Sequence, residues 1–462
     1  MRTPRIAGTA PATLAQGFDA IRAELELPGV FPPDVEDAAE RAAAVPVPPG
    51  RADRRDLPFI TIDPPGSTDL DQALHIAPDG DGWVLSYAIA DIGLYAPAGG
   101  PVDAEARSRG ETIYLPDRRT LLYPAVLTEG AASLLPDVDR PCVLFTIPVG
   151  ADGEIGEGRV EPALMRSTDK LAYQDVGPRT VPHLRAMGEA LAAAGERRGT
   201  TRIDLPEATV APDPAAPSGY RLDVRERLPS EEWNEQVSLA ANIVAARKLV
   251  AARTGLFRDM GPADPERIAG LRAAAVALGF TVPDEEGPAA LAHAHAPSPE
   301  AAAELRRGAR AAAGAGYAPF DPERPPFHAA VAAAYSHATA PMRRMADRHV
   351  LDALVALDAG APAPVTAWGE LAKAMNAADS RAARADAAAL DLVEAFLLAP
   401  RVGAEFDAVV TGATEDGVRI QLRDPPARAA MGMRPPAAPG TALRVRLTAA
   451  DLAKRRLTFA PV

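Results

Sequence analysis

The segment Thr61 to Ile76 carries three aspartates on a short, bent stretch of chain. An apolar run ends just before Asp63, Pro64-Pro-Gly66 forces a turn, and Asp69 and Asp71 follow two residues apart, so both can project from one side of an extended backbone. Hard divalent cations such as Mg²⁺ bind carboxylate oxygens and usually retain water and substrate phosphate. The spacing therefore predicts a cation site that activates water for phosphoryl transfer.

The segment by itself also fits other kinds of loop. Aspartates beside glycine and proline also occur in solvated turns, where their side chains cap the backbone, and for the segment alone this interpretation stays open. A calcium-binding EF-hand is excluded, because the twelfth position counted from Asp69 is Gly80, where the loop needs glutamate. The chain also lacks His-Glu-x-x-His, Gly-Lys-Ser/Thr and Gly-x-Ser-x-Gly motifs, so zinc-protease, P-loop and serine-hydrolase chemistry are disfavoured.

Two further segments contain residues suited to nucleic acid. Tyr114 lies on a short apolar stretch ending at Pro116, where its ring could stack on a base or stay in the core with a satisfied hydroxyl. The segment Thr339-Ala-Pro-Met-Arg-Arg344 leads into a helical pattern. Cations at a helix N-terminus oppose the helix dipole, so helix stability does not explain Arg343 and Arg344. Guanidinium groups beside a carboxylate site would instead suit phosphate binding.

Length, composition and charge limit the class of protein. At roughly 100–200 residues per domain, 462 residues allow two to four domains. The single cysteine, Cys142, excludes an intramolecular disulfide and a cysteine-based metal cage, which favours a reducing compartment. We find no signal peptide and no apolar run long enough for a membrane span, so we expect a soluble, cytoplasmic protein, acting as a monomer and without membrane partners. The net charge of −13 argues against a broadly basic surface, so any nucleic acid needs a local patch.

Strand-like and helix-like segments are unevenly distributed along the chain. Apolar strand patterns dominate up to about residue 180, whereas helical periodicity dominates from there to residue 398. Strands first and helices later favour an α+β body over residues 51–402, not a doubly wound parallel sheet. The expected strands are 59–62, 73–76, 83–90, 142–149 and 159–165, and the expected helices are 183–198, 231–254, 265–278, 342–357 and 365–398.

The two ends of the chain differ from this body. Residues 401–462 hold ten Arg or Lys against six Asp or Glu and show short alternating strands, which favours a small OB-fold barrel over residues 403–462. A β-rich dimerisation or capping module is the alternative. Residues 1–50 contain two helical patterns, 13–26 and 35–44, and predict a small helical module that is either helix-turn-helix-like or a plain cap. Residues 283–326 are rich in Ala, Pro and Gly and predict loops or an insertion.

In combination, these motifs resemble the ribonuclease II/ribonuclease R family, processive 3′→5′ exoribonucleases whose catalytic body is the RNB domain. The resemblance covers about residues 51–400. It rests on the acidic loop, the Tyr114 segment with Leu115-Pro116, the segment Asn234-Glu-Gln-Val-Ser-Leu-Ala-Ala-Asn242, and Thr339 to Arg344. It implies an α+β multidomain fold: an RNB-like body of mostly antiparallel sheet flanked by helices, followed by an OB-fold barrel of the S-one type.

The resemblance also implies a reaction and a set of roles. Single-stranded RNA would be hydrolysed from its 3′ end to nucleoside 5′-monophosphates, with Mg²⁺ or Mn²⁺ as cofactor. The catalytic residues would be Asp69, Asp71 and Arg343, with Asp71 indispensable to chemistry and Arg343 holding the scissile phosphate. The remaining roles are metal ligands at Asp63, Asp69, Asp71 and Gln72, and RNA contacts at Tyr114, Glu235, Arg343 and Arg344, with Tyr114 stacking on the 3′-terminal nucleotide and Glu235 contacting its ribose.

Several positions depart from the family pattern. Gln72 stands where the family has a fourth aspartate, and it offers one neutral oxygen in place of a charge. The glutamate of the late helix has no counterpart near Ala385, with Asp386 the nearest acid, and a stacking aromatic is missing at Ile203 to Pro206. Fifty N-terminal residues are too few for the cold-shock barrels of bacterial relatives. These departures keep a second reading open, a catalytically weakened RNB-like RNA-binding protein; a phosphodiesterase for small nucleotides is disfavoured by the basic tail.

Overall fold

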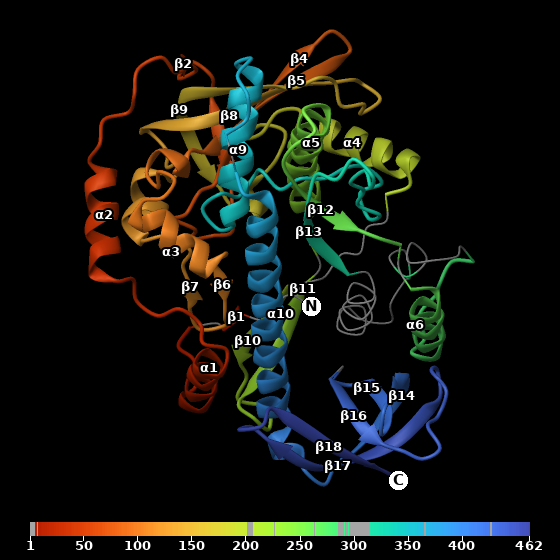
Figure 1. Ribbon diagram of the computed structural model, residues 1–462. Coiled ribbons are helices and arrows are strands. Elements are labelled where there is room, and N and C mark those ends of the chain that lie inside the picture. Colours follow the sequence, from red (N-terminus) through yellow and green to blue (C-terminus); the bar gives the residue numbers. More distant parts are fainter. Residues whose placement is uncertain are drawn as a thin grey trace.

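The computed structural model describes residues 5–6, 8–200, 207–225, 227–262, 264–284, 291, 294, 314–364, 366–425 and 427–462. A large upper body and a smaller C-terminal barrel are joined by one long helix (Figure 1). The predictions for Ile203 to Pro206 and for much of the 283–326 stretch lie outside the described residues.

The body is built around a sheet that closes on itself. Its strands are β2 (Ala52–Asp53), β3 (Phe59–Ile62), β4 (Gln72–Asp79), β5 (Gly82–Ala90), β8 (Asp139–Val149) and β9 (Arg159–Leu171), in the order β2-β9-β3-β4-β5-β8. Strand β9 pairs with β3 on one side and with β8 on the other, which closes the sheet into a barrel. All pairings are antiparallel except those of β9 with β2 and β3.

Helices and short strands make up the rest of the described chain before the C-terminal unit. The helices are α1 (Ala12–Glu24), α2 (Pro33–Ala43), α3 (Pro101–Arg109), α4 (Leu184–Arg198), α5 (Pro229–Ala251), α6 (Pro265–Ala277), α9 (Met345–Asp358) and α10 (Trp368–Leu398). The short strands are β1 (Arg5–Ile6), β6 (Ile113–Tyr114), β7 (Arg119–Thr120), β10 (Glu207–Pro212), β11 (Tyr220–Arg225), β12 (Leu256–Met260) and β13 (Ala315–Pro319). Helical turns lie at Ile92–Leu94, Val126–Ala131, Tyr173–Asp175 and Ala399–Arg401.

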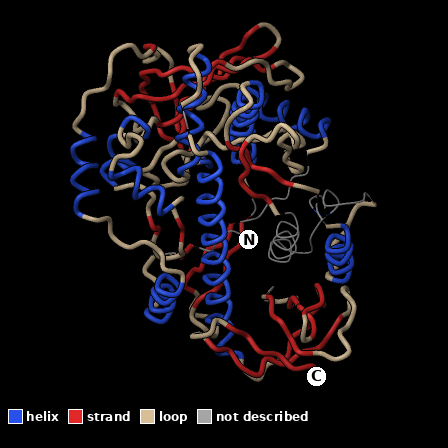
Figure 2. The backbone as a smooth tube through the Cα atoms, viewed as in Figure 1, coloured by secondary structure: helices blue, strands red, loops and turns tan. Residues whose placement is uncertain are grey.

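Helix α10 is the axis of the molecule. Its 31 residues, rich in the good helix former Ala, extend for about 46 Å. It contacts β6 and α1 of the body along its length and β17 and β18 of the barrel near its end. The tube view shows this single helix running from the body to the strand-rich end of the chain (Figure 2).

The C-terminal unit is a five-stranded barrel. Its strands are β14 (Glu405–Thr414), β15 (Gly417–Leu422), β16 (Arg428–Gly432), β17 (Ala442–Asp451) and β18 (Arg456–Pro461), in the order β16-β15-β14-β17-β18, and β16 also contacts β18. Alternate residues of these strands fill one core, to which α10 adds Ala395 and Leu398. Together with the closed sheet of the body, this barrel confirms the predicted fold class.

The two N-terminal helices pack into different cores. Phe18 and its neighbours on α1 pack against α10, whereas Val35 and Ala39 of α2 belong to the core of the body. Gly17 makes the first contact possible, because a Cβ there would lie 2.5 Å from a Leu392 methyl carbon. The segment that the sequence predicts to be one helical module therefore contributes to two cores.

The start of α9 differs from the sequence prediction. The helix begins at Met345, three residues later than expected, because Arg344 is extended (φ −135°, ψ 119°) and bridges to Glu111. Arg343 and Arg344 thus precede the helix and do not form its first turn.

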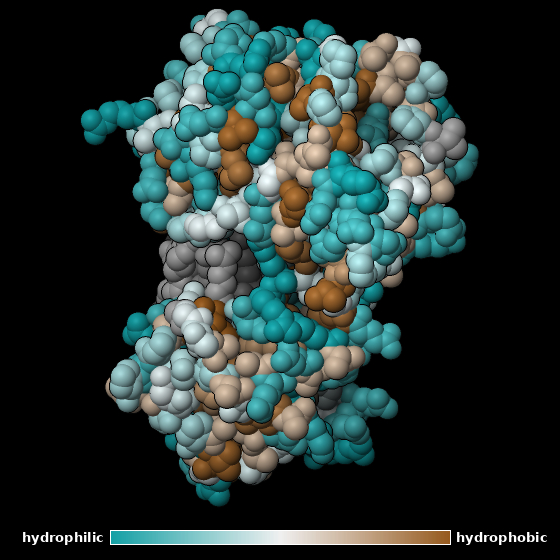
Figure 3. Space-filling model, turned by 90° about the vertical axis from the view of Figure 1, so that its left-hand side faces the viewer, coloured by the Kyte–Doolittle hydropathy of each residue, from teal (hydrophilic) through white to brown (hydrophobic). Residues whose placement is uncertain are grey.

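Polar residues cover much of the visible surface, and apolar residues form small separate patches (Figure 3). Of the helices among the described residues, none combines the length and the apolar character that a membrane crossing requires.

We predict that Phe18→Ala lowers the free energy of unfolding by about 3–5 kcal/mol, because the ring is fully buried between α1 and α10. Urea unfolding measures the change, with Val30→Ala, at a site 94% exposed, as the control. An unchanged unfolding curve for Phe18→Ala would mean that α1 does not pack on the body.

Candidate active site

The acidic loop connects two neighbouring strands of the barrel. Asp63 follows β3 directly and donates its backbone N–H to the Leu171 carbonyl (3.1 Å), so the last residue of the strand ladder fixes it. Gly66 then turns the chain with φ +82°, a conformation that favours glycine. Leu70 is fully buried between the two remaining aspartates and anchors the loop in the core. The aspartates are therefore held on both sides by the barrel.

Ser133, from a later segment of the same chain, holds this loop in place. Its hydroxyl accepts a hydrogen bond from the Leu70 N–H (3.0 Å) and donates one to the Thr68 carbonyl (2.7 Å). The N–H of Leu134 donates to the Leu70 carbonyl (3.0 Å). The side chain of Lys170 donates to the Ser67 carbonyl. These bonds leave the loop little freedom to relax away from its aspartates.

The arginine segment meets the acidic loop at Asp71. One carboxylate oxygen of Asp71 accepts a hydrogen bond from the Met342 N–H at 2.8 Å, and the other lies 3.9 Å from Nε of Arg343. Arg343 itself is held by its carbonyl, which accepts from the Thr112 N–H at 3.0 Å. The structure thereby brings together two residues 272 positions apart that the sequence assigns to one site.

Arg344 occupies a different position from Arg343. Its guanidinium forms a forked ion pair with Asp347, at 3.0 Å from Nε and 2.7 Å from Nη2. Asp347 is fully buried and also accepts the Ala340 N–H at 2.8 Å. This ion pair shapes the turn that carries Arg343, so Arg344 supports that turn. The RNA contact predicted for Arg344 stays a prediction.

Burial dominates the environment of the two inner aspartates. Burial, together with the charges of Asp71 and Asp69, raises the pKa of Asp63 to about 7 despite the nearby Arg343 and Lys170. Burial also raises the pKa of Asp71 to about 7, although Arg343 and the Met342 amide favour its charged form. An added cation would stabilise both carboxylates in their charged form.

Asp69 and Tyr114 lie at the outer side of the site. Asp69 forms an ion pair with Arg119 (2.6 Å), which also pairs with Glu129 (2.5 Å). Tyr114 is paired across the β6–β7 hairpin with Arg119. Burial raises the pKa of the Tyr114 hydroxyl, and Arg343 is the strongest nearby charge opposing that shift. Tyr114 is nonetheless 43% exposed, and a surface on which a base stacks requires such exposure.

Gln72 has its amide fully engaged. Its oxygen accepts hydrogen bonds from the Tyr87 hydroxyl (2.5 Å) and from Ser238 (3.2 Å), and its nitrogen donates to the Thr339 carbonyl. A carbonyl oxygen has two lone pairs, so in this arrangement none remains for a metal. The amide links β4 to α5 and to the arginine segment, which is a structural role that the metal-ligand assignment did not foresee.

Glu235 and Asn242 both lie on α5. Glu235 is 48% exposed on its side chain and forms an ion pair with Arg227 at 2.8 Å. Asn242 is buried and donates to the Tyr335 hydroxyl (3.1 Å), while its oxygen accepts the Ala338 N–H (2.8 Å). Asn242 therefore supports the chain leading to Arg343, and the ribose contact predicted for Glu235 stays a prediction.

Sequence reasoning missed three charged residues of this region. Burial raises the pKa of Glu111 to about 7, and this residue bridges to the arginine segment. Asp347 and Arg119 pair with the residues described above. Glu111 and Asp347 each stand three residues from a residue that the sequence singles out, Tyr114 and Arg344. The pairing of Arg119 with Asp69 joins distant segments and leaves no local pattern.

The oxygens around Asp71 fit a hard divalent cation in kind. They are carboxylates, they are partly or fully buried, and burial raises the pKa of both Asp63 and Asp71, so a cation would favour their charged forms. Within the described residues, no group of three or more His, Cys, Asp or Glu is assembled closely enough to hold a metal ion. Asp69, turned to Arg119, would have to exchange that partner to join Asp63 and Asp71.

The comparisons with protein families match two parts of the chain. Residues 51–357 match the RNB domain, and residues 404–462 match the RNase II-type exonuclease C-terminal S1 domain. Ribonuclease R of Escherichia coli (strain K12) is 29% identical over 446 residues, which cover 86% of this chain and 53% of that protein. Ribonuclease R of Vibrio cholerae is 30% identical over 241 residues, which cover 48% and 29%. The chain thus spans about half the length of the first relative, and its match to the second covers 29% of that protein.

Solved structures show the same fold at low sequence identity. Mycoplasma genitalium RNase R in complex with ribose-methylated single-stranded RNA has a TM-score of 0.81 at 20% identity, covering 98% of this chain and 78% of that one. Yeast Ssd1, a pseudonuclease, has a TM-score of 0.69 at 15% identity, covering 94% and 55%. Because the RNB match extends over more than half of the 462 residues and is followed by the matching S1 domain, this chain belongs to the RNB family of ribonuclease II and ribonuclease R.

Proposed function

We propose that this chain, acting as a monomer, is a 3′→5′ exoribonuclease that hydrolyses single-stranded RNA to nucleoside 5′-monophosphates with the help of Mg²⁺ or Mn²⁺. The observation that carries the proposal is the meeting of the acidic loop and the arginine segment at Asp71. Family membership supports the reaction class, and the relative from M. genitalium was solved with single-stranded RNA.

Arg343 is suited to hold the scissile phosphate. Its side chain is 45% exposed, and its Nε lies 3.9 Å from Asp71, close enough for one phosphate to contact both the guanidinium and a cation near the carboxylates. The hydrogen bond from the Thr112 N–H to the Arg343 carbonyl fixes the backbone from which the guanidinium extends. A positioned guanidinium stabilises the negative charge that develops on the phosphate oxygens in the transition state.

The carboxylates are suited to hold the cation and to orient water. Asp63 and Asp71 would be the inner ligands, with Asp69 joining them once it leaves Arg119. When bound, Mg²⁺ or Mn²⁺ supplies positive charge for the leaving oxygen and makes water a better nucleophile. Arg119 would then be released beside the substrate, where it adds a second cation for phosphate.

Tyr114 is suited to stack on the terminal base. It lies on the same hairpin as Arg119, and its pKa responds to Arg343, Asp69 and Asp71, so its ring borders the site from the outside. Stacking tolerates any base because every base has a π-face. We assign to Glu235 the contact with the ribose of the terminal nucleotide. The 2′-hydroxyl of that ribose would donate a hydrogen bond to the carboxylate, and this contact would distinguish RNA from DNA.

A catalytically weakened RNA-binding protein is the second candidate function. The engaged amide of Gln72 favours it, as does the lack of a preassembled three-carboxylate group within the described residues. The likeness to yeast Ssd1 indicates that this fold also serves a pseudonuclease. Release of mononucleotides from a 3′-labelled RNA in the presence of Mg²⁺ or Mn²⁺ separates the two functions, since the second requires binding without turnover.

Asp71→Asn should lower the rate of mononucleotide release by more than about 100-fold while RNA affinity is retained, because the loss of charge removes a ligand without emptying the site. Single-turnover hydrolysis and filter binding measure the two quantities. Asp79→Asn, an exposed residue at the far end of β4, is the matched control. Equal rates for Asp71→Asn and the control would remove Asp71 from the mechanism.

Arg343→Ala should lower kcat about 100- to 1000-fold, because a positioned donor to the developing charge is lost. Arg343→Lys should recover part of this loss, since it keeps the charge but not the fork. Steady-state kinetics on single-stranded RNA measure both variants. A change confined to KM in Arg343→Ala would mean that the residue binds RNA without acting in the transition state.

Gln72→Glu should destabilise the protein by about 1–3 kcal/mol, because a carboxylate oxygen would replace the donor that faces the Thr339 carbonyl. We expect the Mg²⁺ concentration at half-maximal activity to stay unchanged. Urea unfolding and a Mg²⁺ titration measure these effects. A clearly lower Mg²⁺ requirement in the variant would identify position 72 as a metal ligand after all.

A further inference from the structure

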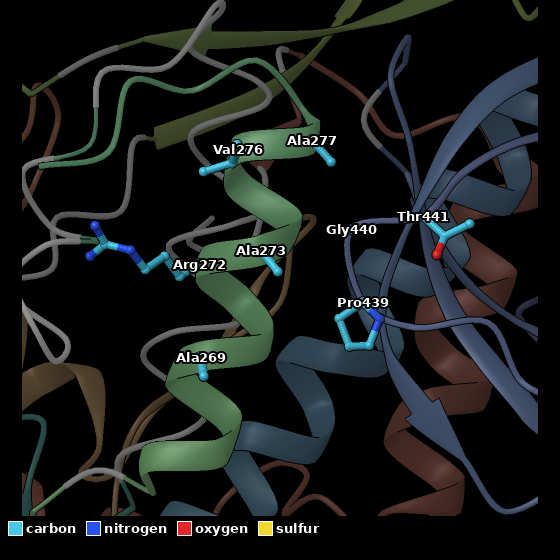
Figure 4. Close-up of a pocket in the computed structure, with 8 residues that line it drawn as sticks. All are labelled: Ala269, Arg272, Ala273, Val276, Ala277, Pro439, Gly440 and Thr441. Carbon is cyan, nitrogen blue, oxygen red and sulfur yellow. The ribbon is translucent and has the colours of Figure 1, made fainter. Parts of the chain in front are cut away.

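A cavity of about 640 Å³ lies between α6 and the loop at Pro439 to Thr441. Small alanine side chains of α6 face this loop, whereas Arg272 and Val276 extend to the other side of the helix (Figure 4). Arg272 donates a hydrogen bond to the Pro283 carbonyl (2.5 Å). The rest of the described lining is small and mostly apolar, so this cavity does not identify a ligand.

Helix α1 makes a more specific contact, because Arg22 binds the turn of the β6–β7 hairpin. This turn consists of Leu115 to Arg118, and the Leu115 N–H donates to the Arg118 carbonyl (3.3 Å) across it. Arg22 donates from Nη1 (3.0 Å) and from Nη2 (2.5 Å) to the two carboxylate oxygens of Asp117. Its Nη2 also donates to the Arg118 carbonyl (3.3 Å). One guanidinium thus holds both a side chain and the backbone of the turn, and we call this contact the Arg22–Asp117 fork.

The Arg22–Asp117 fork is largely shielded from solvent. The side chains of Arg22 and Asp117 are 12% and 13% exposed. A second ion pair between α1 and the hairpin, Arg118 with Asp19 (2.7 Å), is 61% and 59% exposed. Exposed ion pairs add little to stability, whereas a forked pair of arginine and carboxylate fixes both distance and orientation. We therefore assign the placement of the turn on α1 to the fork.

Apolar side chains hold the same hairpin from one face. Ile113 and Leu115 are buried in one core with residues of α1, among them Phe18. Successive side chains of a strand point to opposite faces, so Tyr114, which stands between them, points away from this core. Its ring is 43% exposed, as that direction requires. Helix α1 therefore supports the face of the hairpin opposite to Tyr114.

The hairpin has little structure of its own to fix its outer face. Strands β6 and β7 contain two residues each, and an isolated two-stranded hairpin is marginally stable at best in water. The outer face carries Tyr114 and its cross-strand partner Arg119, which forms the ion pair with Asp69. Support of the turn by α1 therefore also fixes the two hairpin residues that border the acidic loop.

We propose that the Arg22–Asp117 fork positions Tyr114 for the 3′-terminal nucleotide, which makes Arg22 a positioning residue of the exoribonuclease. This inference rests on the proposed function, because it assumes that Tyr114 stacks on the terminal base. Without the fork, the hairpin would have to be ordered when RNA binds, and that cost would be subtracted from the affinity that stacking provides.

Two RNAs that differ only at the 3′ end test the proposal, one with a terminal base and one with a terminal abasic ribose. Filter binding in the Asp71→Asn background, in which we expect binding without hydrolysis, gives the ratio of their Kd values. We expect a ratio of about 10 for this parent, about 3 for Arg22→Met and about 1 for Tyr114→Ala, since only a base can stack. Arg22→Met combined with Tyr114→Ala should not lower the ratio below that of Tyr114→Ala alone, because both changes remove the same interaction.

Glu24→Gln is the matched control. It breaks another ion pair of α1, to Arg455 of the C-terminal barrel (2.5 Å), only two residues along the same helix from Arg22. The control should keep the ratio of the parent. Arg22→Lys should recover part of the ratio, since lysine keeps the charge but not the fork. If Arg22→Met lowers the free energy of unfolding but keeps the ratio of the parent, Arg22 has a merely structural role and the proposal is overturned.

Hydrogen exchange tests the placement of the hairpin without RNA. In Arg22→Met, amides of residues 113–120 should exchange about 10-fold faster than in Glu24→Gln, because local opening of the hairpin becomes less costly. Equal exchange rates in the two variants would overturn the proposal, since the fork would then not hold the hairpin.

The proposed function and the positioning role can be told apart. If Tyr114→Ala loses the ratio and Arg22→Met keeps it, only the positioning role fails. If Tyr114→Ala keeps the ratio of the parent, the stacking role of Tyr114 in the proposed function fails, and the positioning role fails with it. If the chain with Asp71 intact hydrolyses neither RNA, the exoribonuclease proposal fails, while the Kd ratio and the exchange rates still decide whether the fork positions Tyr114.

Discussion

The site depends on one carboxylate that two distant segments share. Asp71 receives a backbone hydrogen bond from Met342 and lies beside the guanidinium of Arg343, so the acidic loop and the arginine segment cannot be placed independently. The carboxylate is buried, and leaving it without these partners would carry a large desolvation cost. The fold is therefore obliged to close at this point, and the same closure places the guanidinium of Arg343 next to the carboxylate of Asp71.

Rigid elements hold the like charges of the aspartates together despite their mutual repulsion. The closed barrel delivers the aspartates from β3 and β4, and the buried side chain of Leu70 prevents the loop from moving its carboxylates apart. On the other side, the ion pair of Arg344 with Asp347 is buried, which costs desolvation energy and is an inefficient source of stability. Its forked geometry instead fixes the turn that holds Arg343, so this pair contributes precision where the chemistry needs it.

Sequence reasoning located what is encoded locally. The strands and helices of the body follow apolar periodicity, and Asp63, Asp71 and Arg343 stand in segments whose spacing already indicates phosphoryl chemistry. It failed where a partner comes from far along the chain. It did not predict that the Gln72 amide donates a hydrogen bond to the carbonyl of Thr339, 267 residues away. The helix after Arg344 starts late because the backbone there pairs with Glu111, a tertiary contact that no helical pattern records.

The distribution of charge suits a chain that must attract a polyanion without coating itself in it. The net charge is −13, whereas Arg343 in the body and several arginines of the C-terminal barrel are local positive groups. Helix α10 holds these two regions at a fixed separation, because its first turns pack into the core of the body and its last turn packs into the core of the C-terminal barrel. Under the proposed function, an RNA strand bound at both regions would lie along this helix, with its reacting end beside Asp71.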